Sequence, residues 1–590
     1  FFSLISNTCG GYSFYKDAKL LRITRYRYNN IPADSNGKYY YINDDGVIWN
    51  PGTMPSATET DTYECRHGLG YSRFCSSKNN LKAELLVFVP SDASCEINCL
   101  KLKNNSETEK NISLFSYVEF CLWNAVDDAS NFQRNLSIGE VEVQGSTIYH
   151  KTEYRERRKH YSFFTVNTQV DNYDTNRDAF LGAGNGNAFP EAVCKKKCSN
   201  SIASGWDPIA AHQIDLTLLP GEEKEFVFML GYCENPADDK WEAPGIINKT
   251  SAKALIERFN TMEKAMQAFA ELKNYWETLL ARFAVVSENE HIDRMANIWN
   301  QYQCMVTFNM SRSASYYESG TGRGMGFRDS CQDLLGFVHL IPERARERII
   351  DIASTQFPDG SAYHQYQPLT KQGNLDVGSG FNDDPLWLIA AVAAYIKETG
   401  DYGILDVQVP FDCKKGTEVP LFEHLEKSFY YTVTHLGPHK LPLIGRADWN
   451  DCLRLGADGE STFVALQFYY AMTILKEFAA YKKDDEYIAY LDESQEKLGK
   501  IIQELCWNED RFIRGFTESG ETIGKRTDPE ANMWLNPQSW AVISGFASDE
   551  QADKALEMVY ERLNTEYGAI LMDPPYHAHA FDGALAVIYN

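Results

Sequence analysis

The stretch "TSAKALIERFNTMEKAMQAFAELKNYWETLLARF" (residues 250–283) decides the fold, because the spacing of apolar residues changes where it begins. Within it, Ala, Leu, Phe and Met recur every three or four positions with Lys and Glu between them, which is the pattern of an amphipathic helix. Strand-like patterns precede this stretch, and further helical patterns separated by irregular loops follow it. We therefore predict a helical linker at residues 246–285 that joins two domains.

The sequence before residue 245 is typical of β-strands. Segments such as "LRITRYRYN" (21–29) and "QIDLTLLPGEEKEFVFML" (213–230) alternate or cluster β-branched and aromatic residues, and "PGEE" supplies a turn. Many short strands separated by turn residues predict an all-β sandwich. We assign residues 1–245 to an N-terminal β-sandwich domain.

Helical segments dominate after residue 285. "DPLWLIAAVAAYIKETG" (384–400) and "STFVALQFYYAMTILKEFAAYKK" (461–483) are long and apolar, and irregular stretches rich in Gly, Pro, Asp and aromatic residues separate such segments. Helix pairs stacked around a ring would bury the apolar faces and gather the irregular loops at one end. The sequence predicts an α/α barrel at residues 286–590.

Composition excludes several classes of protein. The net charge of −25 disfavours nucleic acid as the main partner, and no run of 18 apolar residues exists to span a bilayer. Fourteen scattered cysteines without a signal peptide predict reduced thiols in a cytoplasmic protein. The two C-x3-C pairs, Cys95/Cys99 and Cys194/Cys198, lack partners that would complete a zinc site, so we predict no metal and no cofactor.

The irregular loops of the helical half combine acids, aromatic residues and glycine. A carboxylate beside Trp or Tyr hydrogen-bonds sugar hydroxyls while the ring covers the apolar face of the sugar, so these loops predict a carbohydrate pocket. The glycines of "GTGRGMGF" lack the strand and βαβ context of a nucleotide-binding loop. The loops in question are 311–333, 357–367, 378–387, 445–453 and 573–584.

Several long strings resemble glycoside hydrolase family 94, the inverting disaccharide phosphorylases, and within it the members that act on cellobiose. The resemblance covers nearly the whole chain. The strings are "ITRYRYNN" (23–30), "YECRHGLGYS" (63–72), "FQRNLSIGEVEV" (132–143), "ESGTGRGMGFRDSCQDLLG" (318–336), "GFNDDPLWL" (380–388), "GRADWNDCL" (445–453) and "YHAHAFDGALAVIYN" (576–590).

The resemblance implies a fold and a reaction. The fold is an N-terminal β-sandwich, a helical linker, an (α/α)6 catalytic barrel and a small C-terminal β-domain, assembled as a homodimer. The reaction is reversible phosphorolysis of cellobiose with inversion, which gives α-glucose 1-phosphate and glucose. Family chains begin earlier and continue well past residue 590, so we expect an incomplete barrel, phosphate-binding His and Thr beyond Asn590, and little activity in the chain as given.

This chemistry requires one acid. An inverting hydrolase needs a second carboxylate to activate water, but a phosphate dianion is already nucleophilic. The family motif places the general acid on Asp451 in "DWND", and we expect apolar, partly desolvated surroundings that favour its protonated form. We predict a structural role for Asp448, as a loop cap or as a residue that orients the motif.

Residue-by-residue matching implies the other contacts. Arg323, Asp329 and Trp449 are expected to bind the transferred glucosyl unit, and Gln133 and Arg134 of the sandwich the leaving glucose. A guanidinium offers two parallel donors to phosphate. The candidate for one side of the phosphate site is Arg312, with Arg328 as a competitor.

Two alternatives remain open from the sequence. In a hydrolase on the same barrel, Asp448, Asp383 or Asp384 would activate water, whereas a non-catalytic glucan-binding protein would use the aromatic loops as a platform. Phosphorylases of cellodextrins, laminaribiose or chitobiose are related possibilities. We predict local hydrogen-bonding roles for three histidines, His364, His577 and His579.

Overall fold

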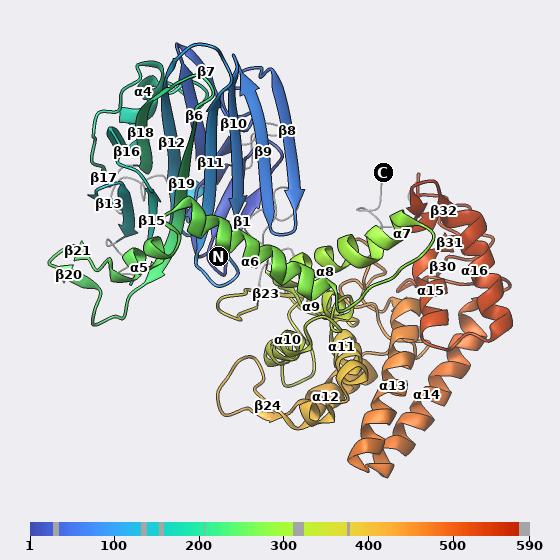
Figure 1. Cartoon of the computed structure of the whole chain (residues 1–590). Helices are drawn as coiled ribbons and strands as arrows, with labels where there is room; N and C mark the ends of the chain where they lie inside the picture. Colours follow the sequence, from blue (N-terminus) through green and yellow to red (C-terminus); the bar gives the residue numbers. More distant parts are fainter. Residues whose placement is uncertain are drawn as a thin grey trace. The chain divides into compact units, whose positions relative to one another are not determined.

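The computed structural model describes residues 1–27, 35–130, 139–152, 159–205, 207–310, 324–373 and 378–577 (Figure 1). The chain forms two compact units. The first spans Phe1–Ala284, and the second comprises Val285–Arg312 together with the chain from Gly324 onward.

Within the described residues, two large antiparallel sheets build the first unit. The eight-stranded sheet contains β1 (Phe2–Ile5), β2 (Gly11–Phe14), β3 (Arg22–Thr24), β6 (Lys38–Asp44), β7 (Val47–Trp49), β12 (Lys110–Trp123), β16 (Asn172–Asn176) and β18 (Pro208–Leu218). The nine-stranded sheet has the order β17 (Ser204–Gly205), β13 (Gly139–Gln144), β14 (Thr147–Thr152), β15 (His160–Val166), β19 (Glu223–Glu234), β11 (Cys95–Asn104), β10 (Leu81–Phe88), β9 (Tyr71–Lys78) and β8 (Thr62–Gly68).

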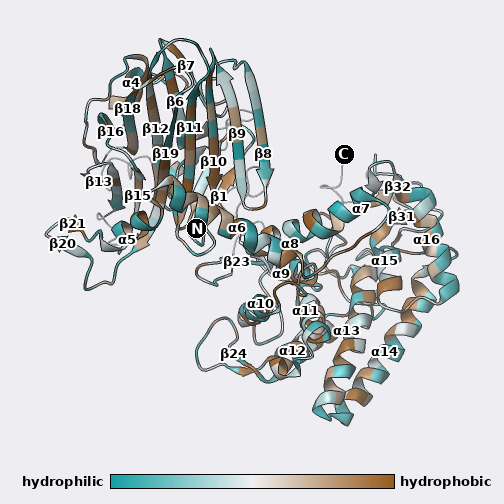
Figure 2. Ribbon diagram, in the orientation of Figure 1, coloured by the Kyte–Doolittle hydropathy of each residue, from teal (hydrophilic) through white to brown (hydrophobic). Residues whose placement is uncertain are grey.

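Alternation along the strands explains why the two sheets pack face to face. In β10, every second residue from Leu81 to Val87 joins the apolar core, and Leu85 pairs in register with Leu100 of β11. The same core contains Leu114 of β12, which belongs to the other sheet. Hydrophobic colour accordingly runs along these central strands in Figure 2. The predicted β-sandwich is confirmed.

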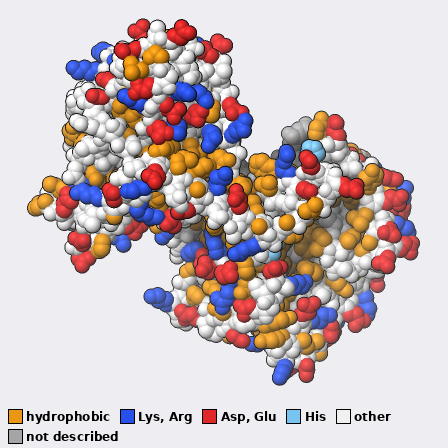
Figure 3. Space-filling view, viewed as in Figure 1, with side chains coloured by type: hydrophobic (Ala, Val, Ile, Leu, Met, Phe, Trp, Pro, Cys, Tyr) orange, Lys and Arg blue, Asp and Glu red, His pale blue; other side chains and the backbone are white. Residues whose placement is uncertain are grey.

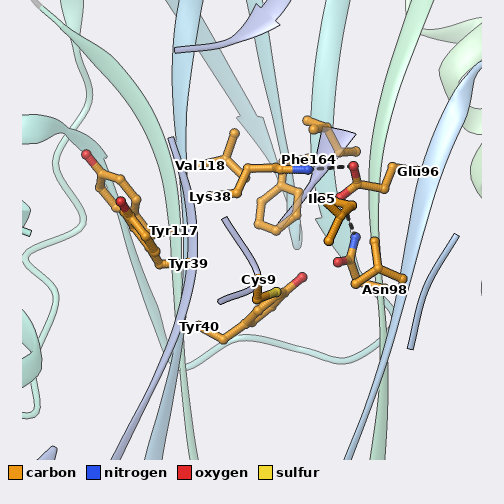
Figure 4. A pocket seen from close by; sticks show the side chains of 12 residues that line it. Ile5, Cys9, Lys38, Tyr39, Tyr40, Glu96, Asn98, Tyr117, Val118 and Phe164 are labelled. Carbon is orange, nitrogen blue, oxygen red and sulfur yellow. Dashed lines mark hydrogen bonds and ion pairs between the residues drawn. The ribbon is translucent and has the colours of Figure 1, made fainter. Parts of the chain in front are cut away.

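A small cavity lies inside the sandwich (Figure 4). Lys38 Nζ donates to Glu96 Oε2 at 2.6 Å, and Glu96 also accepts hydrogen bonds from Ser13 and Asn98. Tyr40 forms part of its lining. Because Lys38 and Glu96 form a buried, hydrogen-bonded ion pair, the charged groups in this cavity need no ligand to balance them.

The helical stretch at 250–283 forms two helices, α5 (Thr250–Phe259) and α6 (Met262–Leu280). The Phe269 ring of α6 meets Tyr71 of β9 edge-on at 5.0 Å and lies 5.4 Å from Phe88 of β10. The apolar face of α6 is therefore buried against the nine-stranded sheet.

The second unit consists of inner helices that contact one another and outer helices that cover them. In chain order, its helices are α7 (Glu290–Arg294), which continues through a π-helical turn (Met295–Trp299) into α8 (Asn300–Met310), then α9 (Phe327–Leu335), α10 (Pro342–Ser354), α11 (Asp384–Thr399), α12 (Leu421–Thr434), α13 (Thr462–Lys482), α14 (Asp485–Leu505), α15 (Leu535–Ile543) and α16 (Asp549–Leu563). Contacts run α9–α11–α13–α15 on the inside, while α10 and α12 flank α11, α14 flanks α13 and α16 flanks α15.

Hydropathy explains which helices lie inside. Helices α11 and α13 are apolar on nearly every side and mostly buried, whereas α14 and α16 have one apolar face (Figure 2). Alternating inner and outer helices are the arrangement predicted for the catalytic domain.

On the face shown in Figure 3, acidic and basic side chains are interspersed. Across the described part of the chain, none of the helices combines the length and apolarity that crossing a membrane requires.

Candidate active site

The inner helices bring their N-terminal ends together. Arg328 in the first turn of α9 pairs with Asp383 at the start of α11. Ser461, the N-cap of α13, donates a hydrogen bond to Asp448, which pairs with Arg514. The Arg514 guanidinium lies 5.4 Å from the ring of Trp534, which precedes α15. The loops that precede four inner helices therefore meet at one end of this unit, as the sequence predicts.

Asp451 lies at the surface of this loop cluster. Its side chain is 50% exposed, and its Oδ1 accepts a hydrogen bond of 2.7 Å from Arg328 Nη2. His364 Nε2 lies 3.8 Å from the same oxygen. The structure does not show the apolar, desolvated surroundings expected for Asp451: its carboxyl group is half exposed to solvent and paired with a cation.

Arg328 bridges two carboxylates. It is buried, with Nη1 3.0 Å from Asp383 Oδ2 and Nη2 on Asp451. Burial alone lowers the pKa of Arg328, but the charges of Asp383, Asp384 and Asp451 outweigh it and hold that pKa above its usual value. Arg328 is therefore a fixed positive charge beside Asp451.

Asp383 and Asp384, which the sequence offers as bases for a hydrolase, are both fully buried. Asp383 accepts hydrogen bonds from Arg328 and from Trp387 Nε1, and burial raises its pKa to about 7 against the opposing effect of Arg328. Asp384 pairs with His364, and burial raises its pKa against that partner. Neither carboxyl group is placed to activate a solvent water.

His364 occupies the space between Asp384 and Asp451. Its Nδ1 lies 3.0 Å from Asp384 Oδ2, and its ring stacks on Phe381 with centroids 4.0 Å apart. Burial lowers the pKa of His364, but the hydrogen bond and charge of Asp384 outweigh that effect and raise it. The sequence predicts only a local hydrogen bond for His364; its approach to Asp451 depends on tertiary structure.

Asp448 has the structural role predicted for it. Both of its carboxylate oxygens lie 2.7 Å from Arg514 Nη2, one accepts from Ser461 Oγ, and the other accepts from the backbone N–H of Asn450. Asp448 and Arg514 are completely buried. This anchor holds the loop from which Asp451 projects.

Trp449 is exposed at the surface of the loop cluster, and Asp329 is partly buried in the first turn of α9. Trp449 is 43% exposed, and its Nε1 donates to Gln332 Oε1 at 3.3 Å. Gln332 follows Asp329 by three positions on α9, so the two share one helix face. An open aromatic face next to a carboxylate is the arrangement that sugar rings require.

Four predicted binding residues, Gln133, Arg134, Arg312 and Arg323, lie outside the described residues, as does His579. His577 is exposed, and its backbone N–H donates to Glu530. Within the described ranges, no three His, Cys, Asp or Glu side chains lie close enough together to hold a metal ion.

Two family profiles match the chain: "Glycosyl hydrolase 94, supersandwich domain" over residues 1–262 and "Glycosyl hydrolase 94 superfamily, catalytic domain" over residues 275–589. N,N'-diacetylchitobiose phosphorylases of Vibrio furnissii and Vibrio proteolyticus are 30% and 31% identical over 98% of this chain and 73% of each relative. Solabiose phosphorylase of Paenibacillus borealis is 30% identical over 91% of this chain and 67% of that protein.

A solved structure of a bacterial glucoamylase complexed with acarbose superposes with a TM-score of 0.59 at 13% identity, covering 97% of this chain and 83% of that one. At that identity the likeness concerns the fold.

Proposed function

Because the chain belongs to the glycosyl hydrolase 94 family, we propose that it catalyses reversible phosphorolysis of a β-linked disaccharide with inversion at the anomeric carbon. In this reaction inorganic phosphate replaces the leaving sugar and yields an α-sugar 1-phosphate. Phosphate is a co-substrate, and no cofactor is involved. The homodimer implied by the resemblance stays a prediction.

One observation carries the proposal: of the four acids that the sequence offers as proton donor or as base, Asp451 alone is half exposed, while Asp383, Asp384 and Asp448 are buried and paired. An inverting hydrolase needs a second carboxylate with room for a water, typically about 6.5–9.5 Å from the acid. None of the three buried acids offers such a base. A single proton donor is sufficient when phosphate is the nucleophile.

In the proposed mechanism, Asp451 is the proton donor and inorganic phosphate is the nucleophile. Asp451 donates its proton to the glycosidic oxygen as the bond from that oxygen to the anomeric carbon breaks. A phosphate oxygen forms the new bond to the same carbon from the opposite face, which inverts it. Sugar bound against Asp451 displaces water, and loss of water favours a neutral carboxyl group.

Trp449 and Asp329 are the proposed contacts to the transferred sugar. The open face of Trp449 covers its apolar side, and Asp329 accepts hydrogen bonds from its hydroxyls, which strengthen as positive charge develops on the ring. Arg323, Gln133 and Arg134 as sugar contacts, and Arg312 as a phosphate contact, remain proposals based on the family motifs.

We propose cellobiose as the first candidate substrate, because the motif strings favour it. N,N'-diacetylchitobiose is the second candidate, because two relatives that cover nearly the whole chain carry that name. The two substrates differ in the group at carbon 2, a hydroxyl against an acetamide. The acceptor sugar also varies among relatives.

The test is a substrate panel with and without phosphate. The full-length protein is incubated with cellobiose, N,N'-diacetylchitobiose, laminaribiose and cellodextrins, and sugar 1-phosphate is quantified. The reverse reaction, from glucose 1-phosphate or N-acetylglucosamine 1-phosphate with a series of acceptors, is scored by phosphate release. Equal sugar release without phosphate would identify a hydrolase, and binding without turnover would identify a glucan-binding protein.

A further inference from the structure

His364 is held on two sides by the fold. Asp384 accepts a hydrogen bond from its Nδ1 at 3.0 Å, and Phe381 stacks on its ring at 4.0 Å with an angle of 20° between the planes. Its side chain is 6% exposed. The direction in which Nε2 points is therefore fixed by packing.

That direction leads to Asp451, the residue proposed above as the general acid. Nε2 lies 3.8 Å from Asp451 Oδ1, the oxygen that Arg328 also contacts. Asp451 is half exposed, so packing alone does not hold its side chain. A small rotation closes the remaining gap, and catalytic hydrogen bonds are often long before substrate binds.

The hydrogen bond from Nδ1 to Asp384 determines whether Nε2 of His364 donates or accepts a hydrogen bond. An acceptor at Nδ1 keeps a proton there, so Nε2 of the neutral ring carries a lone pair. A lone pair facing a carboxyl group is matched only by the O–H of protonated Asp451. When the ring is charged instead, Nε2–H donates to the Asp451 carboxylate. In both cases His364 and Asp451 share one proton.

We propose that His364 is a positioning residue for Asp451: Asp384 and Phe381 fix its ring, and Nε2–H of the charged ring holds Asp451 Oδ1, so that Oδ2 carries the proton that passes to the glycosidic oxygen. The inference rests on the proposed role of Asp451 as proton donor. The charged groups that face the His364 ring are Asp384, Asp451 and Arg328.

The first test measures the coupling without turnover. Histidines are labelled with 15N, and the His364 ring is titrated by NMR in the wild type and in Asp451→Asn. We expect its pKa to fall by about half a unit or more in the variant, because a nearby negative charge is lost. His439 is an internal control, because Glu460 holds its Nδ1 and Phe516 stacks on it. An unchanged His364 titration overturns the proposal.

The second test compares isosteric variants in the phosphorolysis assay. Asn at position 364 keeps a donor near Asp384 and loses Nε2, whereas Gln places an amide near the Nε2 position. We expect His364→Asn to lower kcat roughly 10- to 100-fold with little change in KM and to shift the pH–rate profile. His364→Gln should recover part of the rate, and His439→Asn should match the wild type.

The outcomes are distinguishable. A His364→Asn enzyme with wild-type kcat and pH profile overturns the positioning role but leaves the proposed reaction intact. If the wild type releases no sugar 1-phosphate from any disaccharide, the proposed function fails, and the NMR titration alone decides whether His364 and Asp451 share a proton. Urea unfolding of each variant separates loss of fold from loss of positioning.

Discussion

Arg514 Nη2 lies 2.7 Å from both carboxylate oxygens of Asp448, and neither side chain is exposed. Replacing Asp448 with Asn leaves an uncompensated buried guanidinium. We expect the free energy of unfolding to fall by about 3–5 kcal/mol, measured from urea denaturation. Glu496→Gln breaks an exposed pair with Lys500 and should leave the unfolding midpoint unchanged. Similar midpoints for the two variants would contradict this prediction.

Asp451→Asn is expected to reduce kcat by about 10²- to 10⁴-fold, because the amide cannot donate the proton. Sugar binding, measured by calorimetry, should be retained. Asp458→Asn changes an exposed acid of the same loop and should keep full activity. An Asp451→Asn enzyme with wild-type turnover would exclude the general acid role.

Trp449→Ala is expected to weaken sugar binding about tenfold, because stacking and burial of an aromatic face contribute about 1–1.5 kcal/mol. Stability should change little, since the side chain is 43% exposed. Trp299 has a similar exposure of 47% in the same unit, so Trp299→Ala is the matched control. Equal affinities in both variants would place the sugar elsewhere.

Acid should destabilise the sandwich through two buried histidines. Burial lowers the pKa of His150 and of His212 from 6.5 to about 3. Below pH 6.5 the unfolded chain therefore binds protons that the folded chain does not, and the free energy of unfolding falls until about pH 3. The expected loss is about 1.4 kcal/mol per pH unit for each histidine.

The measurement is the urea midpoint between pH 7 and pH 5. His150 stacks on Phe120 at 4.7 Å, so His150→Phe preserves an aromatic ring and should remove about half of this pH dependence, with His212 supplying the rest. The exposed His291 provides the control variant His291→Gln, which should keep the wild-type slope. Parallel slopes in all three proteins would show that His150 does not contribute.

The sequence predicts the fold well because periodicity reports burial directly. The pattern of 213–230 identifies strands on either side of a turn, and the continuous apolar run in 384–400 identifies a helix buried on nearly all sides. The sequence also predicts a structural role for Asp448, which the buried pair with Arg514 supports, whereas the acid role of Asp451 stays a proposal.

The site is predicted less completely, because its contacts join distant segments. His364 and Asp451 are 87 positions apart and meet only when α11 and α13 are in place. Asp383 and Asp384 are neighbours in sequence, yet they pair with different partners, since consecutive residues at a helix start point in different directions. The half-open setting of Asp451 likewise depends on loop geometry.

The loops that precede the four inner helices meet at one end of the catalytic unit. Stability and sugar recognition therefore depend on different parts of this unit. The inner helices and the buried Asp448–Arg514 pair stabilise the unit, whereas the exposed loop positions are free to vary and to recognise other sugars. Exchanging those exposed positions between relatives, with Asp448 and Arg514 retained, is therefore a practical route to altered specificity.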